Sequence, residues 1–284
     1  MKQPTIALIY DFDGTLSPGN MQEFGFINQT NHTTEEFWDE TNKIAKDQDA
    51  SEILTYMYYM LKAAKANNIS LQRQSFQEFG SQITFFKGVE EWFDRINQYA
   101  VQQGVILKHY IISSGLKEMI EGTRIAQEFE QIYACSFLYN VDGIAEWPAA
   151  SIDYTAKTQI LFKINKGIKE VNDNIKINRY MDNDKRPIPF ENMIYFGDGE
   201  TDVPSMKMVK DHGGHAIAVH DPNSKEREET VKNLLLEERV NFVTEADYTQ
   251  EKPLNKLVEY LIKKIKIDTT LKEFARQQKR DIIE

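Results

Sequence analysis

Cysteine, excess positive charge and long apolar runs are scarce in this chain, and each shortage excludes a class of protein. Cys135 is the single cysteine among 284 residues, so the chain cannot form a disulfide framework of its own and suits a reducing cytoplasm. Lysine and arginine total 34 against 44 aspartate and glutamate, a formal net charge of -10. We therefore expect no nucleic acid and no membrane as partner, because both attract basic surfaces.

Apolar residues never approach the roughly 20 in a row that a membrane-spanning helix requires. The first apolar run is short and ends at Asp11, which is unlike a secretory signal peptide. Hydrophobic residues make up 41% and charged residues 27% of the chain, the composition of an ordinary globular protein. A chain of this length accommodates one large core with a smaller appended unit. We expect a globular protein of the cytoplasm.

Short runs of β-favouring apolar residues are present, and they alternate with amphipathic segments. This alternation is typical of a parallel β-sheet whose strands are joined by right-handed helical crossovers. The expected strands are 6–10, 105–113, 193–196 and 215–219, with weaker candidates at 132–139 and 241–243. The expected helices are 89–103, 116–129, 155–171, 203–210 and 253–266. We predict an α/β fold built on a parallel sheet.

The interval 17–85 breaks the alternation, because it contains no convincing strand. Thr33 followed by Glu36 predicts a capping box that opens a helix, and the patterns of 51–67 and 71–83 are also helical. We therefore predict a helical domain at 17–85, inserted after the first strand. The core domain would then comprise 1–16 and 86–284.

Four other segments are given structural interpretations. The aromatic and methionine run 56–60 is interpreted as helix-bundle core, with the lining of a pocket for an apolar substrate group as the alternative. The acidic run 226–229 is interpreted as the solvated face of a helix. The polar segment 172–192 contains two prolines and is expected to be a surface excursion. The charged tail 268–284 is expected to be a peripheral helix.

Acidic and hydroxyl side chains lie at the ends of three expected strands. Asp11 and Asp13 come directly after 6–10, Ser113 ends 105–113, and the sequence GDGETD follows 193–196. Because ligands of an open parallel sheet bind beyond the carboxyl ends of its strands, we expect these groups to meet at one edge. Several carboxylates in one place require a hard cation, and Mg²⁺ suits a site with few carboxylates and a phosphate.

Four motifs in this chain resemble those of the haloacid dehalogenase (HAD) superfamily. They are, in the superfamily's order, DFDGTL, IISSG, the lysine of DYTAKTQ and GDGETD. The resemblance covers most of the chain, and the helical insert falls where phosphoserine-phosphatase-like members have their type 1 cap. It implies a Rossmann-like core, a helical cap and a Mg²⁺-dependent hydrolase.

The resemblance also implies a role for each motif residue. Asp11 would be the nucleophile that forms an aspartyl-phosphate, and Asp13 the general acid that later becomes the general base. Ser113, favoured over Ser114, would hold the phosphoryl group together with the neighbouring backbone N–H groups, so Ser114 and Gly115 are also substrate-binding candidates.

Charge balance and metal binding are implied for the remaining motif residues. Lys157 would balance the charge between Asp11 and the phosphate, with Lys163 and Lys166 as its competitors. The resemblance places Mg²⁺ on Asp11, on the backbone carbonyl of Asp13 and on Asp198. Asp202 would hold metal-bound water or orient Lys157.

The residues that follow the first motif enter the cap, which usually sets specificity in this superfamily. Asn20, Met21 and Gln22 are therefore candidate substrate contacts. Phosphoserine phosphatases have an acid nine residues past the nucleophile, whereas this chain has Asn20 there. The substrate class that remains is a small phosphorylated metabolite, with phosphocholine, phosphoethanolamine and small sugar phosphates all compatible.

Asp13 favours phosphomonoester hydrolysis, because the dehalogenases have no carboxylate at this position. Two alternatives stay open: a phosphomutase of the same superfamily, and a catalytically inactive binding or regulatory protein on the same scaffold. All four motifs carry competent side chains, which favours the enzyme. The sequence thus predicts a Mg²⁺-dependent phosphatase.

Overall fold

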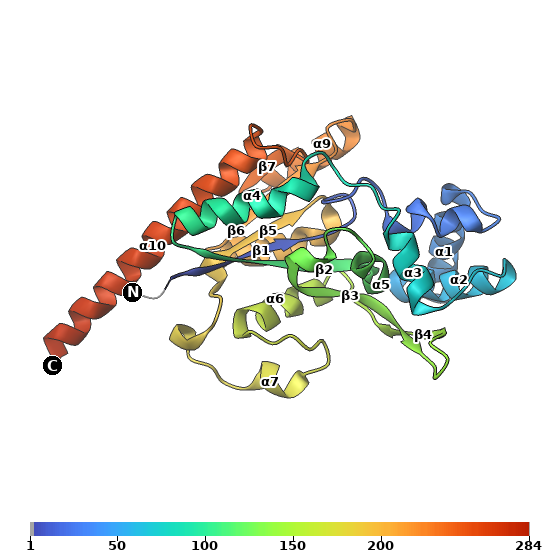
Figure 1. The fold of residues 1–284 in the computed structure, drawn as a ribbon, viewed down its shortest axis with the longest axis horizontal. Coiled ribbons are helices and arrows are strands. Elements are labelled where there is room, and N and C mark those ends of the chain that lie inside the picture. Colours follow the sequence, from blue (N-terminus) through green and yellow to red (C-terminus); the bar gives the residue numbers. More distant parts are fainter. Residues whose placement is uncertain (1–2, 284) are drawn as a thin grey trace.

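The computed structural model describes residues 3–283, and within that range the strands form a seven-stranded sheet of order β4-β3-β2-β1-β5-β6-β7 (Figure 1). The strands are β1 Thr5–Tyr10, β2 Ile106–Leu116, β3 Phe129–Tyr139, β4 Ala145–Ala150, β5 Met193–Gly197, β6 His215–His220 and β7 Phe242–Glu245. The neighbouring strands from β3 to β7 are parallel, while β4 pairs with β3 in the antiparallel direction. The predicted α/β fold is confirmed, with an antiparallel edge strand added.

Strand β1 is central, and its residues 6–10 are completely buried. An apolar run that is buried on both sides is what a parallel sheet covered by helices requires. Figure 1 shows α4 and α10 over one face of the sheet and α6 over the other. The helices that follow the strands are α4 Val89–Gln102, α5 Lys117–Glu121, α6 Ala156–Lys166, α8 Val203–Asp211, α9 Lys225–Leu236 and α10 Pro253–Ile283.

The predicted helical insert lies between β1 and α4, beyond one end of the sheet (Figure 1). Its helices are η1 Met21–Phe24, η2 Ile27–Gln29, α1 Thr34–Gln48, α2 Glu52–Ala66 and α3 Arg73–Gly80. Helix α1 begins with the predicted capping box, in which Thr33 and Glu36 each accept a hydrogen bond from the other's backbone. The domain limits at residues 16 and 86 stay a prediction, which this arrangement supports.

The predicted helix 116–129 is too long, because α5 covers only Lys117–Glu121 and β3 already begins at Phe129. Helix α3 of the insert packs backbone to backbone against α5. A Cβ atom added at Gly80 would lie 1.9 Å from the Met119 carbonyl oxygen, and one added at Gly122 would lie 2.0 Å from that of Gln77. A contact between segments so distant in sequence leaves no periodic pattern in the sequence from which the end of α5 could be predicted.

Other boundaries differ for local reasons. Helix α6 ends before Gly167, which adopts a left-handed φ of +69°, instead of continuing to 171. The excursion 172–192 contains α7 Asn174–Asn178, η4 Asn183–Lys185 and η5 Phe190–Asn192. The expected helices 253–266 and 268–284 form the continuous helix α10, whose described part ends at Ile283. Within residues 3–283, none of the helices has both the length and the apolar character needed to cross a membrane.

Candidate active site

Three aspartates meet beyond the carboxyl ends of β1 and β5. Asp11 follows β1, Asp198 follows β5, and Asp202 lies at the start of α8. All three are buried, and one carboxylate oxygen from each lies within 4.8 Å of the other two. The structure therefore brings together acids from opposite ends of positions 11–202, as the strand-end argument predicts.

Lys157, on α6, joins two of these acids. Its Nζ lies 2.9 Å from Asp11 Oδ1 and 2.8 Å from Asp202 Oδ1, and its side chain is 1% exposed. Tyr195 also donates a hydrogen bond to Asp202 Oδ1, at 2.7 Å. Burial alone would lower the pKa of Lys157, but the two carboxylates outweigh burial and raise it. Lys157 is therefore held as a charged group at the base of the site.

The competing lysines of α6 point elsewhere. Lys163 donates to the backbone carbonyls of Glu170 and Asp173, and Lys166 to those of Ile177 and Arg179. Both side chains therefore attach the excursion 172–192 to α6, and the structure brings Lys157 to the acidic cluster.

Two glycines make room for the carboxylates. Gly14 has a left-handed φ of +73°, and a Cβ atom there would lie 2.0 Å from Asp198 Oδ2. A Cβ atom at Gly197 would lie 2.6 Å from the carboxylate carbon of Asp202. No side chain fits at either position without moving an acid, so the motif glycines allow the convergence as well as the turn.

Asp13 takes a different direction from the three clustered acids. Its Oδ1 accepts a hydrogen bond from the Met21 backbone N–H at 2.8 Å, which ties the residue to the loop that enters the insert. Burial and the neighbouring Asp11 carboxylate hold the pKa of Asp13 well above its usual range, although the Met21 bond opposes them. The side chain therefore tends to hold a proton.

The cluster carries excess negative charge. Burial, followed by the Asp202 carboxylate, raises the pKa of Asp11 to about 8 and that of Asp198 to about 6. The buried Asp202 Oδ2 has no hydrogen-bond partner among the described residues. A hard divalent cation with a preference for carboxylate oxygens, such as Mg²⁺, fits this donor set and its charge.

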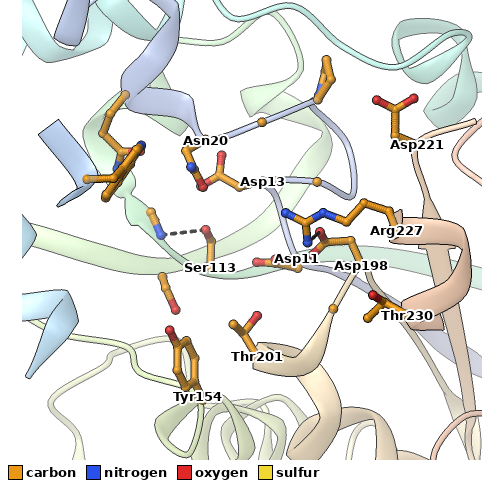
Figure 2. Close-up of a pocket in the computed structure, with 18 of the residues that line it drawn as sticks. Asp11, Asp13, Asn20, Ser113, Tyr154, Asp198, Thr201, Asp221, Arg227 and Thr230 are labelled. Atoms are coloured by element: carbon orange, nitrogen blue, oxygen red, sulfur yellow. Dashed lines mark hydrogen bonds and ion pairs between the residues drawn. The ribbon is translucent and has the colours of Figure 1, made fainter. Parts of the chain in front are cut away.

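The serine motif lies at the end of β2 and faces the same space. Ser113 Oγ accepts a hydrogen bond from the Gly115 backbone N–H at 2.9 Å, so its own proton is available to another group (Figure 2). The Ser114 carbonyl accepts a hydrogen bond from Tyr56 of α2 at 2.7 Å. Gly115 is packed against Met21, whose Cε would lie 2.1 Å from an added Cβ.

A cavity of about 800 Å³ opens over the acids and separates the sheet from the insert. Tyr56 and Glu52 of α2 and Trp38 of α1 line one wall, and Tyr154 reaches across from the core to donate to Glu52 at 3.1 Å. Ser113, Ser114, Gly115 and Lys157 also line this cavity. Its size is typical of sites for small molecules.

The three predicted cap contacts have different surroundings. Gln22 is 2% exposed and lines the cavity, and its Oε1 has no hydrogen-bond partner among the described residues. Asn20 lines the cavity and donates to Glu23 at 2.8 Å. Met21 is completely buried and accepts a hydrogen bond from the Leu116 N–H through Sδ. Met21 therefore fixes the loop, while Gln22 and Asn20 face the cavity.

Two residues at this site were not among the sequence's site candidates. Tyr56 belongs to the run interpreted as core in preference to a pocket lining, and it is both buried in the core and part of the cavity wall. Arg227 of α9 lies in the run interpreted as a solvated face, yet its Nη1 is 3.3 Å from Asp198 Oδ2 (Figure 2). The charged pattern around Arg227 gives no local signal, because the proximity depends on how α9 packs after β6.

Comparisons with known sequences agree with this geometry. The sequence model of haloacid dehalogenase-like hydrolases matches residues 8–207. An uncharacterized protein of Borreliella burgdorferi is 31% identical, over an alignment that covers 93% of this chain and 98% of that protein. The matched range contains all four motifs and the whole helical insert.

Solved structures show the same fold at low sequence identity. A substrate-bound phosphoserine phosphatase complex has a TM-score of 0.56 and 15% identity, covering 91% of this chain and 99% of its own. A HAD family hydrolase from Salmonella enterica subsp. enterica serovar Typhi has a TM-score of 0.54 and 14% identity, covering 86% of this chain and 67% of its own. The Rossmann-like core and its helical cap are thus confirmed.

Proposed function

The chain belongs to the haloacid dehalogenase-like hydrolase family, and we propose that it is a Mg²⁺-dependent phosphatase of a small phosphorylated metabolite. One observation carries the proposal: Lys157 lies between Asp11 and Asp202 at the base of the cavity, with Asp198 beside them. This arrangement combines a carboxylate nucleophile with a fixed cation and an oxygen-rich place for a metal.

Asp11 attacks the phosphorus atom of the substrate in the proposed first step. A bond forms between a carboxylate oxygen of Asp11 and phosphorus, and the bond between phosphorus and the leaving oxygen breaks. Asp13 gives its proton to that oxygen, a role that its raised pKa supports. In the second step Asp13 takes a proton from water, whose oxygen attacks phosphorus, releases phosphate and restores Asp11.

The surrounding residues stabilise charge on the phosphoryl group. Ser113 donates its hydroxyl proton, because its Oγ already accepts from Gly115, and Lys157 neutralises charge near Asp11. Asp202 orients Lys157, a role that its 2.8 Å contact supports. Mg²⁺, held by Asp11, Asp198 and the Asp13 carbonyl, would reduce the repulsion between the carboxylate nucleophile and an anionic substrate.

The cavity also supports the substrate part of the proposal. Its volume of about 800 Å³ suits a metabolite, and Asp11 is only 5% exposed beside it, which favours a small substrate that can enter the cavity. Gln22 and Asn20 are the proposed contacts to the leaving group, whereas Met21 is a positioning residue. The buried free cysteine, Cys135, supports the proposed cytoplasmic location.

Phosphate release from p-nitrophenyl phosphate and from a panel of phosphorylated metabolites tests this function. We expect turnover that requires Mg²⁺ and falls by about 10³-fold or more in Asp11→Asn, because the nucleophile is lost. Asp142→Asn is the matched control, since Asp142 is an exposed acid between β3 and β4. Absence of phosphate release from every compound would contradict the proposal. Transfer between two positions of a sugar phosphate would instead identify a phosphomutase.

A further inference from the structure

Arg227 approaches the acidic cluster from α9, outside the four motifs. Its contact with Asp198 is 3.3 Å long, and its side chain is 58% exposed while lining the cavity. Lys157, in contrast, has two contacts of 2.8 and 2.9 Å and is 1% exposed. The cluster therefore faces one cation that is fixed and another that is weakly held.

The backbone of Arg227 is nevertheless well placed. It lies in the first turn of α9, where the Arg227 N–H donates to the N-cap hydroxyl of Ser224 at 3.3 Å. The Asp198 loop does not crowd the guanidinium, since even a Cβ atom added at Gly199 would lie 3.6 Å from Arg227 Nη1, an ordinary contact distance. The guanidinium can thus change partner while the helix stays where it is.

The charges at the site indicate what would compete with Arg227 for Asp198. Three buried carboxylates, those of Asp11, Asp198 and Asp202, meet two cationic side chains, Lys157 and Arg227, among the described residues at this site. Lys157 contacts Asp11 and Asp202, so Asp198 is left with the weakly held Arg227 as its cationic partner among them. A compact divalent ion attracts a carboxylate oxygen more strongly than a half-exposed guanidinium does, so a cation on Asp198 would displace Arg227.

We propose that Arg227 is a two-position residue: it pairs with Asp198 while no divalent cation is bound, and with the phosphate of the ligand once a cation holds Asp198. A displaced Arg227 remains in the cavity where the phosphoryl group binds. Its planar fork of N–H groups matches two phosphate oxygens, which a lysine cannot do. The second half of this inference rests on the proposed phosphatase function.

Calorimetric titration of Mg²⁺ into the ligand-free protein tests the first position. Arg227→Gln should bind Mg²⁺ about three- to tenfold more tightly than the native protein, because a competing cation is removed. Arg227→Lys keeps the charge and should stay close to the native affinity. Lys225→Gln is the matched control, since Lys225 is an exposed cation in the same turn that does not line the cavity.

Titration of inorganic phosphate at saturating Mg²⁺ tests the second position. Arg227→Gln should weaken phosphate binding by about tenfold, and Arg227→Lys should weaken it by a smaller factor, because the charge remains but the fork is lost. Lys225→Gln should have little effect. An unchanged Mg²⁺ affinity in Arg227→Gln, or equal shifts in Lys225→Gln, would overturn the two-position assignment.

The two proposals fail in different ways. If both titrations give the expected shifts but the native protein releases no phosphate from any substrate, the phosphatase function is wrong and the exchange of Arg227 stands. If turnover is normal but neither affinity changes in Arg227→Gln, the exchange is wrong and the phosphatase function stands.

Discussion

The helical insert meets the rest of the molecule along several borders, and two of them are filled very differently. At the border of α3 with α5 the backbones touch, and Phe76 of α3 packs on Phe137 of β3 with ring centroids 5.4 Å apart. At the border of α2 with the site loops lies the cavity, which is crossed by the hydrogen bonds of Tyr56 and Tyr154. The first border attaches the insert, and the second leaves space for a substrate.

This difference indicates how a ligand enters. Separating α3 from α5 would break close backbone packing and expose aromatic side chains, whereas opening the α2 border would break individual hydrogen bonds between polar groups. We therefore expect the α1–α2 side of the insert to move during entry, while the α3–α5 border stays closed.

The largest effect is expected from Gly80→Ala at the closed border. Gly80 lies in α3, so helix propensity alone would make alanine more stable by about 1 kcal/mol. The collision of its Cβ with the Met119 carbonyl reverses the sign, and we expect a loss of about 2–3 kcal/mol in the free energy of unfolding. Urea denaturation measures this loss. Gln74→Ala is the control, because Gln74 is an exposed residue of the same helix.

A smaller and pH-dependent effect is expected from Arg73→Met at the same border. Arg73 is half-exposed and pairs at 3.3 Å with Glu118, whose side chain is completely buried. Burial raises the pKa of Glu118, and Arg73 opposes that shift. Without Arg73 the pKa rises further, so the folded state holds the Glu118 proton more tightly than the unfolded state does.

The stability of Arg73→Met relative to the native protein should fall as the pH rises. At about pH 4 Glu118 is largely protonated in both states, so Arg73→Met should lose only the contact of the guanidinium with the Tyr139 ring, whose centroid is 4.1 Å away, about 1 kcal/mol or less. As the pH rises toward about 7.5 the buried carboxylate must ionise without its partner, and the variant should lose about 1–2 kcal/mol more. Urea denaturation of both proteins at the two pH values measures the difference. A loss of the same size at both would show that packing, not charge, is the contribution of Arg73.

The smallest effect on stability is expected from Tyr56→Phe at the open border. It removes the hydrogen bond to the Ser114 carbonyl, and we expect a loss of about 1 kcal/mol or less. The KM of the proposed reaction should rise about two- to fivefold, because Tyr56 lines the cavity and holds α2 beside the serine motif. If Tyr56→Phe destabilises the protein as much as Gly80→Ala does, the two borders do not differ as described.

The positions that sequence reasoning predicts well are those that depend on local pattern. Strand β1 follows from its apolar run, and the meeting of Asp11 with Asp198 follows from the geometry of parallel strands. Lys157 is distinguished from Lys163 and Lys166 by motif, not by periodicity, since all three lie on one helix.

The features that were missed depend on contacts between distant segments. Helix α5 ends at Glu121 where α3 packs on it. Strand β4, which contains Pro148, pairs with β3, and its Ala145 N–H donates to the Leu71 carbonyl of the insert. Arg227 and Tyr56 reach the cavity through the packing of α9 and α2. For Arg227 the local composition favours a solvated position and for Tyr56 a core position, and only the assembled fold places both at the cavity.

Identifying the residue that receives the phosphoryl group is the most direct test of the proposed mechanism. Turnover in Mg²⁺ can be stopped with acid, and the peptides can then be analysed by mass spectrometry. We predict a phosphoryl group on the peptide that contains Asp11 in the native protein and none in Asp11→Asn. Continued phosphate release with the label on another peptide would contradict the assignment of Asp11 as nucleophile.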